Sequence, residues 1–189
     1  MISSGIIKAK ETHCMEIAFT DQEIAKMVQM LGEKILDQHR STDDLAFLGI
    51  QTGGVPLAKR LQKILQPHFQ RLIPVGELDV SLYRDDLMLK KNYIPKHKTL
   101  ITYNLNQVHL ILVDDVISSG RTMMAALNSL LDFGRPAVIE AAVLVDRYQR
   151  EVPIQPCFFA KHLKVSMRKY LKMNWVEIEG EDSGIYLDC

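Results

Sequence analysis

The fold of this chain is decided by residues 108–122, which read VHLILVDDVISSGRT. A continuous apolar run ends in two adjacent carboxylates, Asp114 and Asp115, and a short polar loop with glycine then leads into a helical pattern. A strand that is apolar on both faces is typical of a buried parallel sheet. Because ligands of open α/β sheets bind beyond the carboxyl ends of the strands, the loop after this strand is the predicted site.

The loop offers donors for an anion. Ser118, Ser119, Gly120 and Thr122 supply hydroxyls and backbone N–H groups where a helix begins, and helix N-termini attract phosphate. The neighbouring aspartates would repel an isolated phosphate, so the ligand must also want acceptors, as sugar hydroxyls and Mg²⁺ do. A phosphorylated ribose meets both demands. An ordinary strand-to-helix turn with one capping aspartate explains less of the stretch.

Residues 112–122 resemble the phosphoribosyl-pyrophosphate (PRPP) motif of type I phosphoribosyltransferases. The resemblance implies an α/β fold, a parallel sheet flanked by helices, with a flexible flap and a small cap, or hood. It implies that the catalytic carboxylates are Asp114 and Asp115. It also implies a phosphate loop made of Val116, Ile117, Ser118, Ser119, Gly120, Arg121 and Thr122. A nucleoside triphosphatase is disfavoured, because no Gly-Lys-Ser/Thr follows the strand.

The rest of the pattern predicts a single domain over residues 1–189, long enough to bury a substantial core. Residues 20–23, TDQE, have the form of a capping box and begin a helix. The polar excursion at about residues 79–107 is long enough for a functional flap, and the cap spans about residues 147–189. We expect strands at 45–50, 73–78 and 137–145, helices from 55 and over 121–133, and short cap strands at 175–178 and 185–187.

A second glycine turn, Gln51-Thr52-Gly53-Gly54, follows another expected strand. Alone it indicates only turn geometry. Beside the first loop it suits a substrate that carries phosphate at one end and pyrophosphate at the other. In the family that the chain resembles, this loop binds pyrophosphate through backbone amides, which implies that role for Thr52, Gly53 and Gly54.

From about residue 3 to residue 188 the chain resembles the PyrR family, most specifically in GELDVSLYRDDL at residues 76–87. The resemblance implies transfer of phosphoribosyl from PRPP to uracil, giving UMP and pyrophosphate. It implies Mg²⁺ bound mainly through PRPP, with Asp114 and Asp115 as further candidate ligands. It also implies UMP-dependent binding of messenger leader RNA that regulates pyrimidine genes, and a homodimer or higher homo-oligomer.

The chain departs from the PyrR pattern in three places. Family members usually have Thr-Arg-Gly where this chain has residues 52–54, so one cation is missing; Arg84 in the flap is a candidate replacement, although an ion pair with Asp85 or Asp86 explains it equally well. Residues 118–122 replace the usual Tyr-Thr-Gly-Arg-Thr. Residues 160–166 replace Gly-Lys-Asn-Ile-Pro-Thr-Ser in the cap. Base choice therefore stays open, and a purine (hypoxanthine, guanine or xanthine) phosphoribosyltransferase without RNA regulation is the alternative.

Basic residues of the second half are further candidates. Arg147, at a strand end, and Lys161 are candidates for the base site, although Arg147 also suits a salt bridge at the rim. The RNA candidates are Lys164, Arg168, Lys169 and Lys172, in a stretch without acidic residues. A solvated charged face is the alternative interpretation of that stretch.

Composition narrows the class of protein. Lys+Arg and Asp+Glu balance at 23 each, which disfavours a protein that coats DNA or RNA but allows a local basic face. The three cysteines are scattered and are typical of reduced thiols. The sequence shows neither an apolar run long enough for a bilayer nor an export signal. We expect a cytoplasmic enzyme without DNA or membrane partners.

Overall fold

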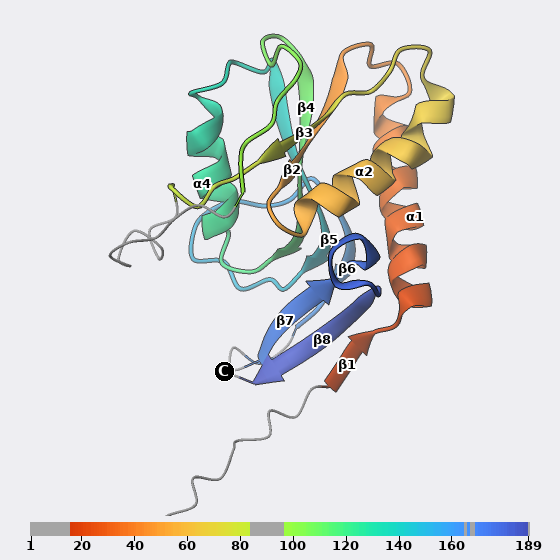
Figure 1. Cartoon of the computed structure of the whole chain (residues 1–189), viewed down its shortest axis with the longest axis vertical. Coiled ribbons are helices and arrows are strands. Elements are labelled where there is room, and N and C mark those ends of the chain that lie inside the picture. Colours follow the sequence, from red (N-terminus) through yellow and green to blue (C-terminus); the bar gives the residue numbers. More distant parts are fainter. Residues whose placement is uncertain (1–15, 84–96, 165, 167–168, 189) are drawn as a thin grey trace, which may run out of the picture.

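The computed structural model describes residues 16–83, 97–164, 166 and 169–188. These residues form two sheets, a larger one of five parallel strands in the order β3-β2-β4-β5-β6 and a smaller antiparallel one in the order β1-β8-β7 (Figure 1). The strands are β1 Glu16–Phe19, β2 Leu45–Ile50, β3 Val75–Leu78, β4 His109–Ile117, β5 Val138–Asp146, β6 Phe158–His162, β7 Lys169–Asn174 and β8 Ser183–Asp188. The helices are α1 Asp21–His39, α2 Gly54–Leu65, the 3₁₀ turn η1 Gln66–His68, α4 Arg121–Leu130 and α5 Val176–Glu179.

Strand β4 lies at the centre of the larger sheet and is buried on both faces, as its apolar run predicts. Ile111 and Val113 belong to the core on the side of α1 and α2, whereas Leu110 and Leu112 belong to the core on the side of α4. Figure 1 shows the same arrangement, with α1 and α2 on one side of the sheet and α4 on the other. Alternate side chains of the strand therefore hold two helical layers.

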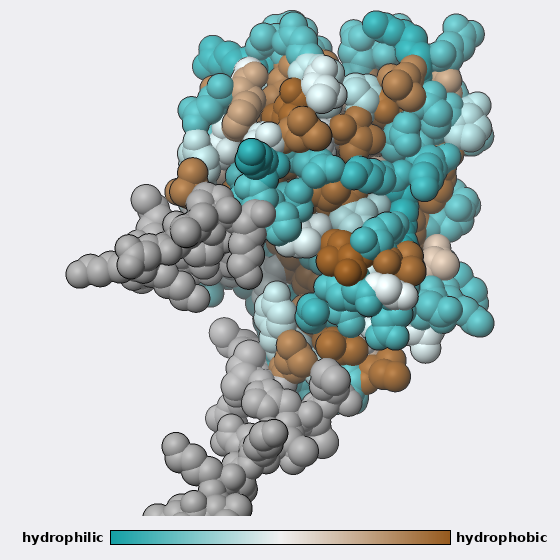
Figure 2. Space-filling view, viewed as in Figure 1, coloured by the Kyte–Doolittle hydropathy of each residue, from teal (hydrophilic) through white to brown (hydrophobic). Residues whose placement is uncertain are grey.

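Helix α1 begins where the capping box predicts. The Thr20 hydroxyl accepts a hydrogen bond from the Glu23 amide, and the Glu23 carboxylate accepts one from the Thr20 amide at 2.9 Å. The helix buries one apolar face against α2 and the sheet. Within the described parts of the chain, no helix combines the length and apolarity that crossing a bilayer requires. On the face seen in Figure 2, small hydrophobic groups are separated by hydrophilic side chains.

The order of the strands places the two glycine loops side by side. Strand β2 pairs in parallel with β4, with Leu45 opposite His109 and Gly49 opposite Val113. From β2 the chain continues outward to β3, whereas from β4 it continues in the other direction to β5. A crevice forms at such a switch point, beyond the carboxyl ends of the strands. The loops after Ile50 and after Ile117 border it.

The smaller sheet, which we call the hood, differs from the expected cap. The strand expected at residues 175–178 is wrong, because Val176–Glu179 form the helix α5. The Glu179 carboxylate accepts a hydrogen bond from the Trp175 amide at 3.0 Å, and Gly180 ends the helix with a φ of 85°. The expected strand at residues 185–187 is confirmed within β8. Strand β6, from the predicted cap region, extends the larger sheet instead, and β1 supplies an edge strand of the hood.

Only the base of the predicted flap lies among the described residues. Leu100 forms an antiparallel bridge with Glu77 of β3. The Tyr103 hydroxyl donates a hydrogen bond to the Phe47 carbonyl oxygen at 2.7 Å, and burial raises the pKa of this tyrosine. Residues 84–96, and with them Arg84, lie outside the described residues. The returning end of the excursion is thus fixed to the sheet at β2 and β3.

Candidate active site

The glycine loop after β2 presses against the end of β4. A Cβ atom on Gly54 would lie 2.2 Å from the Val113 carbonyl oxygen, and a Cβ on Gly53 would lie 1.8 Å from Oδ2 of Asp115. Gly54 needs to be glycine for this approach, because its neighbour is backbone, whereas a Cβ on Gly53 would require the Asp115 side chain to move. The arginine that is usual at position 53 in the family would displace the Asp115 carboxylate. The close contact gives a physical reason for the glycine found here.

Asp114 and Asp115 stand at the carboxyl end of β4. The Asp115 amide donates to Oδ1 of Asp114 at 3.0 Å, and the Val116 amide donates to Oδ1 of Asp115 at 2.7 Å. Burial raises the pKa of Asp115 to about 6, although hydrogen bonds from Val116 and from the Trp175 side chain act in the opposite direction. A carboxylate whose charge is destabilised in this way gains from a cation or from hydroxyl donors.

The loop that follows leads directly into helix α4. Gly120 is its N-cap residue, with a φ of 87° and no side-chain capping bond. The Ser119 hydroxyl accepts a hydrogen bond from the Arg121 amide at 3.3 Å, and the Ser118 hydroxyl donates to Gln149 at 3.1 Å. Together with Thr122, these groups place three hydroxyls at the positive end of a helix, which suits a phosphate.

Residues after β5 hold this loop from behind. Arg150 donates to the Ser118 carbonyl oxygen at 2.8 Å and pairs with the buried Asp146 at 2.9 Å. The Glu151 amide donates to the Ser119 carbonyl oxygen at 2.9 Å. These bonds use the carbonyl oxygens and leave the hydroxyl side of the loop toward the cavity. The loop is therefore shaped by contacts that no ligand would have to break.

The two loops and the hood enclose one cavity of about 500 Å³. Its floor comes from the ends of β2 and β4, and its other wall comes from β7 and α5. The lining residues are Gln51, Thr52, Gly53, Asp114, Asp115, Val116, Ile117, Ser118, Ser119, Gly120, Thr122, Met123, Arg147, Tyr170, Leu171, Lys172, Met173, Trp175, Ile178 and Glu179.

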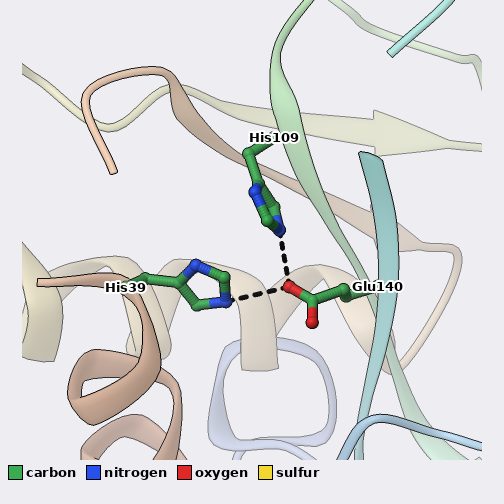
Figure 3. Close-up of side chains that lie close together, drawn as sticks. All are labelled: His39, His109 and Glu140. Carbon is green, nitrogen blue, oxygen red and sulfur yellow. Dashed lines mark hydrogen bonds and ion pairs between the residues drawn. The ribbon is translucent and has the colours of Figure 1, made fainter. Parts of the chain in front are cut away.

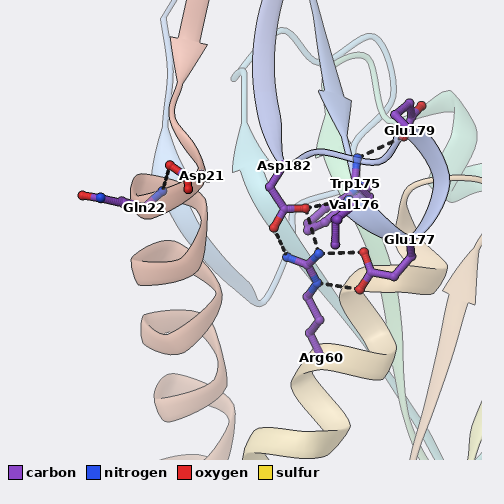
Figure 4. Close-up of polar contacts among 8 residues, drawn as sticks. All are labelled: Asp21, Gln22, Arg60, Trp175, Val176, Glu177, Glu179 and Asp182. Carbon is purple, nitrogen blue, oxygen red and sulfur yellow. Dashed lines mark hydrogen bonds and ion pairs between the residues drawn. The ribbon is translucent and has the colours of Figure 1, made fainter.

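A single arginine fastens the hood to helix α2 (Figure 4). Arg60 donates from Nε and Nη2 to Glu177 at 2.9 and 2.6 Å, and from Nη1 and Nη2 to Asp182 at 2.6 and 2.8 Å. Its guanidinium also lies 4.8 Å from the centroid of the Trp175 ring. Burial opposes the charge of Arg60, but the carboxylates prevail and raise its pKa. Because α2 follows the glycine loop, this contact joins the two walls of the cavity.

Comparison with known proteins identifies the relatives of this chain. Residues 18–167 match the family model of the phosphoribosyl transferase domain. The bifunctional protein PyrR of Picosynechococcus sp. is 42% identical over 162 residues, which cover 86% of this chain and 91% of that protein. The bifunctional protein PyrR of Thermus aquaticus is 40% identical over 161 residues, which cover 85% and 88%. The chain belongs to the PyrR family of phosphoribosyltransferases.

Solved structures agree on the fold. The hypoxanthine phosphoribosyltransferase of Trypanosoma cruzi superposes with a TM-score of 0.67 and 16% identity, and the alignment covers 92% of this chain and 96% of that one. The hypoxanthine phosphoribosyltransferase of Staphylococcus aureus gives a TM-score of 0.62 with 16% identity, over 80% of each chain. The type I phosphoribosyltransferase fold expected from the sequence is confirmed.

The structure brings most of the predicted PyrR-family site residues together. Those of the two loops line the cavity, except that Gly54 packs beneath it and the Arg121 side chain pairs with Glu151 at 2.6 Å. Arg147 also lines the cavity, while its guanidinium donates to the Lys169 and Ser166 carbonyl oxygens. Lys161 lies on β6 and is not among the lining residues that the structure describes.

The predicted RNA residues that the structure describes have different surroundings. Lys172 lines the cavity and pairs with Glu179 at 3.5 Å, and Lys169 pairs with Glu16 of β1. Lys164 is exposed, 5.9 Å from the centroid of the Tyr148 ring. Arg168 lies outside the described residues. The partner of Lys169 comes from the distant strand β1, and the partner of Lys172 lies just beyond the basic stretch, so a count of charges within that stretch could not show either pair.

Sequence reasoning did not assign a site role to the hood residues of the cavity. These are Tyr170, Leu171, Met173, Trp175, Ile178 and Glu179. The strand β7 reads KYLKMN, and its alternation of large apolar residues is the one signal that could have identified it as a wall. The side chain of Trp175 is almost fully buried.

Proposed function

We propose that this chain transfers the 5-phosphoribosyl group of PRPP to uracil, giving UMP and pyrophosphate, on a single domain of residues 1–189. The observation that carries the proposal is that the two aspartates, the hydroxyl loop and the glycine loop line one cavity of about 500 Å³. PRPP needs acceptors for its ribose hydroxyls between donors for its two phosphate-bearing ends. The cavity offers donors at the start of α4, acceptors at the end of β4 and further donors in the glycine loop after β2.

Each part of the substrate has a matching group. The 5-phosphate fits the start of α4, where hydroxyls and helical N–H groups favour an anion. The ribose hydroxyls fit the acceptor oxygens of Asp114 and Asp115. The pyrophosphate fits the backbone of Thr52 and Gly53. The base then lies toward the hood, close to Arg147 and the wall that contains Trp175.

The donor set also fits Mg²⁺, which prefers oxygen ligands and binds through one or two carboxylates together with substrate phosphates. Asp114 and Asp115 are the candidate protein ligands, with the PRPP oxygens supplying the others. When bound, the ion would offset the charge of the leaving pyrophosphate. The raised pKa of Asp115 fits this assignment, because a nearby cation would stabilise the carboxylate that burial destabilises.

The protein contributes position and electrostatics. As the bond from C1′ to pyrophosphate breaks, positive charge develops on the ribose, and the two carboxylates beside it stabilise that charge. The loops hold both reactants in place, so transfer does not need a strong general base. The hood covers the reaction centre and limits access of water.

The base is tested by measuring PRPP consumption with uracil, hypoxanthine, guanine and xanthine in parallel. We expect turnover with uracil and little with the purines. Turnover with a purine alone would overturn the uracil assignment and favour a salvage enzyme. If none of the four bases supports turnover but PRPP binds tightly, the protein would be a nucleotide sensor and not an enzyme.

The second part of the proposal is UMP-dependent binding of pyrimidine-gene leader RNA by a homo-oligomer, which the bifunctional character of the named relatives supports. Lys164 is the exposed candidate for a phosphate contact. Lys164→Gln should lower the slope of log affinity against log salt by about 0.9 or less. Lys63→Gln, on the exposed side of α2, is the matched control. Equal binding of leader and scrambled RNA, whatever the UMP level, would contradict regulation.

The flap completes the proposal. Residues from about 85 to 107 should become protected from hydrogen exchange when PRPP and Mg²⁺ bind, because a lid excludes water from a cation-like centre. Helix α1, which buries one face in the core and lies outside this segment, is the internal reference. Equal exchange with and without ligand over the whole segment would exclude a lid.

A further inference from the structure

A second group of possible metal ligands lies near the amino-terminal ends of β4 and β5, away from the cavity (Figure 3). His39 is the last residue of α1, His109 is the first residue of β4, and Glu140 lies near the start of β5. Oε2 of Glu140 is 2.9 Å from Nε2 of His39 and 2.5 Å from Nε2 of His109. His109 and Asp114 are five residues apart on β4, so the cluster is roughly 17 Å from the catalytic aspartates.

We propose that His39, His109 and Glu140 bind a zinc ion that ties helix α1 to strands β4 and β5. One atom from each of the three side chains lies within 4.8 Å of the other two. Two imidazoles and one carboxylate form a recurrent zinc ligand set, with a fourth position left for water. Mg²⁺ and Ca²⁺ are disfavoured, because they prefer oxygen ligands.

Neighbouring side chains already orient two of the ligands. Nδ1 of His39 is 3.2 Å from the Thr42 hydroxyl, which leaves Nε2 directed at the cluster. The Gln38 amide donates to Oε1 of Glu140 at 3.1 Å, which leaves Oε2 directed at the histidines. Metal-binding histidines and carboxylates typically have such outer partners, which fix the ring and raise affinity.

Burial and charge also favour a cation at this position. The exposed fractions of the side chains are 3% for His39, 12% for Glu140 and 23% for His109. A buried carboxylate normally pairs with a full positive charge, but here its neighbours are imidazoles. Because His109 is the most exposed of the three side chains, one side of the cluster is open to solvent.

The proposal is tested with the full chain, freed of metal by chelation and titrated with Zn²⁺ against a chromophoric chelator. We expect one zinc per chain at this cluster. Glu140→Gln and His109→Asn should each weaken binding by more than the roughly 10- to 100-fold that the loss of an outer partner costs. His68→Asn, an exposed histidine on η1, should bind as the unchanged protein does. Asp114→Asn/Asp115→Asn should also bind normally, which separates this site from the catalytic one.

Three measurements on the unchanged protein guard against variants that fail to fold. With Co²⁺ as the probe, visible absorption of the intensity typical of four or five ligands should develop, and imidazole proton signals of His39 and His109 should shift with Zn²⁺. The melting temperature should rise with zinc concentration. The proposal is overturned if the unchanged protein binds zinc only through Asp114 and Asp115, or binds none. It also fails if Glu140→Gln and His109→Asn retain full affinity, which would leave a hydrogen-bonded cluster.

Discussion

Two pairs of carboxylates, one at the end of β4 and one in the hood, differ in their electrostatic states. On the sheet side, burial raises the pKa of Asp115 to about 6, and no ion pair engages this residue among those that the structure describes. On the hood side, hydrogen bonds from Arg60 lower the pKa values of Glu177 and Asp182. The hood pair is satisfied within the protein and stabilises it, whereas the sheet pair is the one that we propose to be stabilised by substrate and Mg²⁺.

The largest expected effect comes from removing both charges of the sheet pair. Asp114→Asn/Asp115→Asn should lower kcat/KM for PRPP by about 100- to 10,000-fold, since each lost charged hydrogen bond costs about 1.5–3 kcal/mol. Thermal stability should be unchanged or higher, because a destabilised buried charge disappears. Initial rates and melting curves measured on the same preparation test both parts. A stable double variant with normal turnover would show that neither aspartate is needed for activity.

The next effect comes from the hood. Arg60→Met should cost about 2–3 kcal/mol of unfolding free energy, because it leaves Asp182 without its cation in a site that is partly buried. Arg60→Lys, which retains the charge but not the planar fork, should cost less. Trp175 is the sole tryptophan of the chain, so its fluorescence reports on the hood directly. If the Arg60→Met emission and melting temperature match those of the unchanged protein, the guanidinium does not hold the hood.

The pH dependence of the two pairs should have opposite signs. The pKa of Asp115 is about 6, so protonation of this carboxylate should lower kcat/KM for PRPP about tenfold at pH 5. This pH-dependent decrease should be absent in Asp115→Asn. A raised folded-state pKa contributes stability that is present below the unfolded value near 3.8 and is lost as pH rises through 6. The lowered values of Glu177 and Asp182 contribute stability above their unfolded values, which is lost as pH falls. Melting temperatures of Asp115→Asn and Asp182→Asn between pH 4 and 7 test these signs.

The smallest effect separates the two members of the hood pair. The side chain of Glu177 is 43% exposed, whereas that of Asp182 is 17% exposed and also accepts the Val176 amide hydrogen at 2.8 Å. Glu177→Gln should therefore cost less than about 1 kcal/mol, and Asp182→Asn should cost more. Urea unfolding of the two variants gives the comparison. The reverse order would mean that the exposed partner holds the arginine.

Local chemistry was sufficient to predict the part of the site that one strand carries. Residues 108–122 determine the centre of the sheet, the position of the two carboxylates and the start of α4. The signals for a buried strand, a polar turn and a helix start are all carried by consecutive residues, so each can be recognised locally. The capping box before α1 is equally local.

The hood was harder to predict, because its structure depends on distant partners. Val176 and Ile178 alternate with polar residues as in a strand, but carboxylates of Glu179 and Asp182 bond the first amides and favour a helix. The cavity wall formed by Leu171 and Trp175 follows from packing against α2, and Arg60, which arranges it, lies more than a hundred residues earlier in the chain. No window of sequence contains both sides of such a contact.

The order β1-β8-β7 has a consequence for the newly made chain on the ribosome. Glu16 of β1 pairs with Tyr186 of β8, which also pairs with Leu171 of β7, so the middle strand of the hood is synthesised after the two strands beside it. Four strands of the larger sheet, β3-β2-β4-β5, end at Asp146 and can form while the hood strands are still being synthesised. The hood has to wait until β8 has left the exit tunnel. We expect the cavity to be completed only after translation of the hood strand, so partially synthesised chains fold their phosphate loop before they can enclose a base.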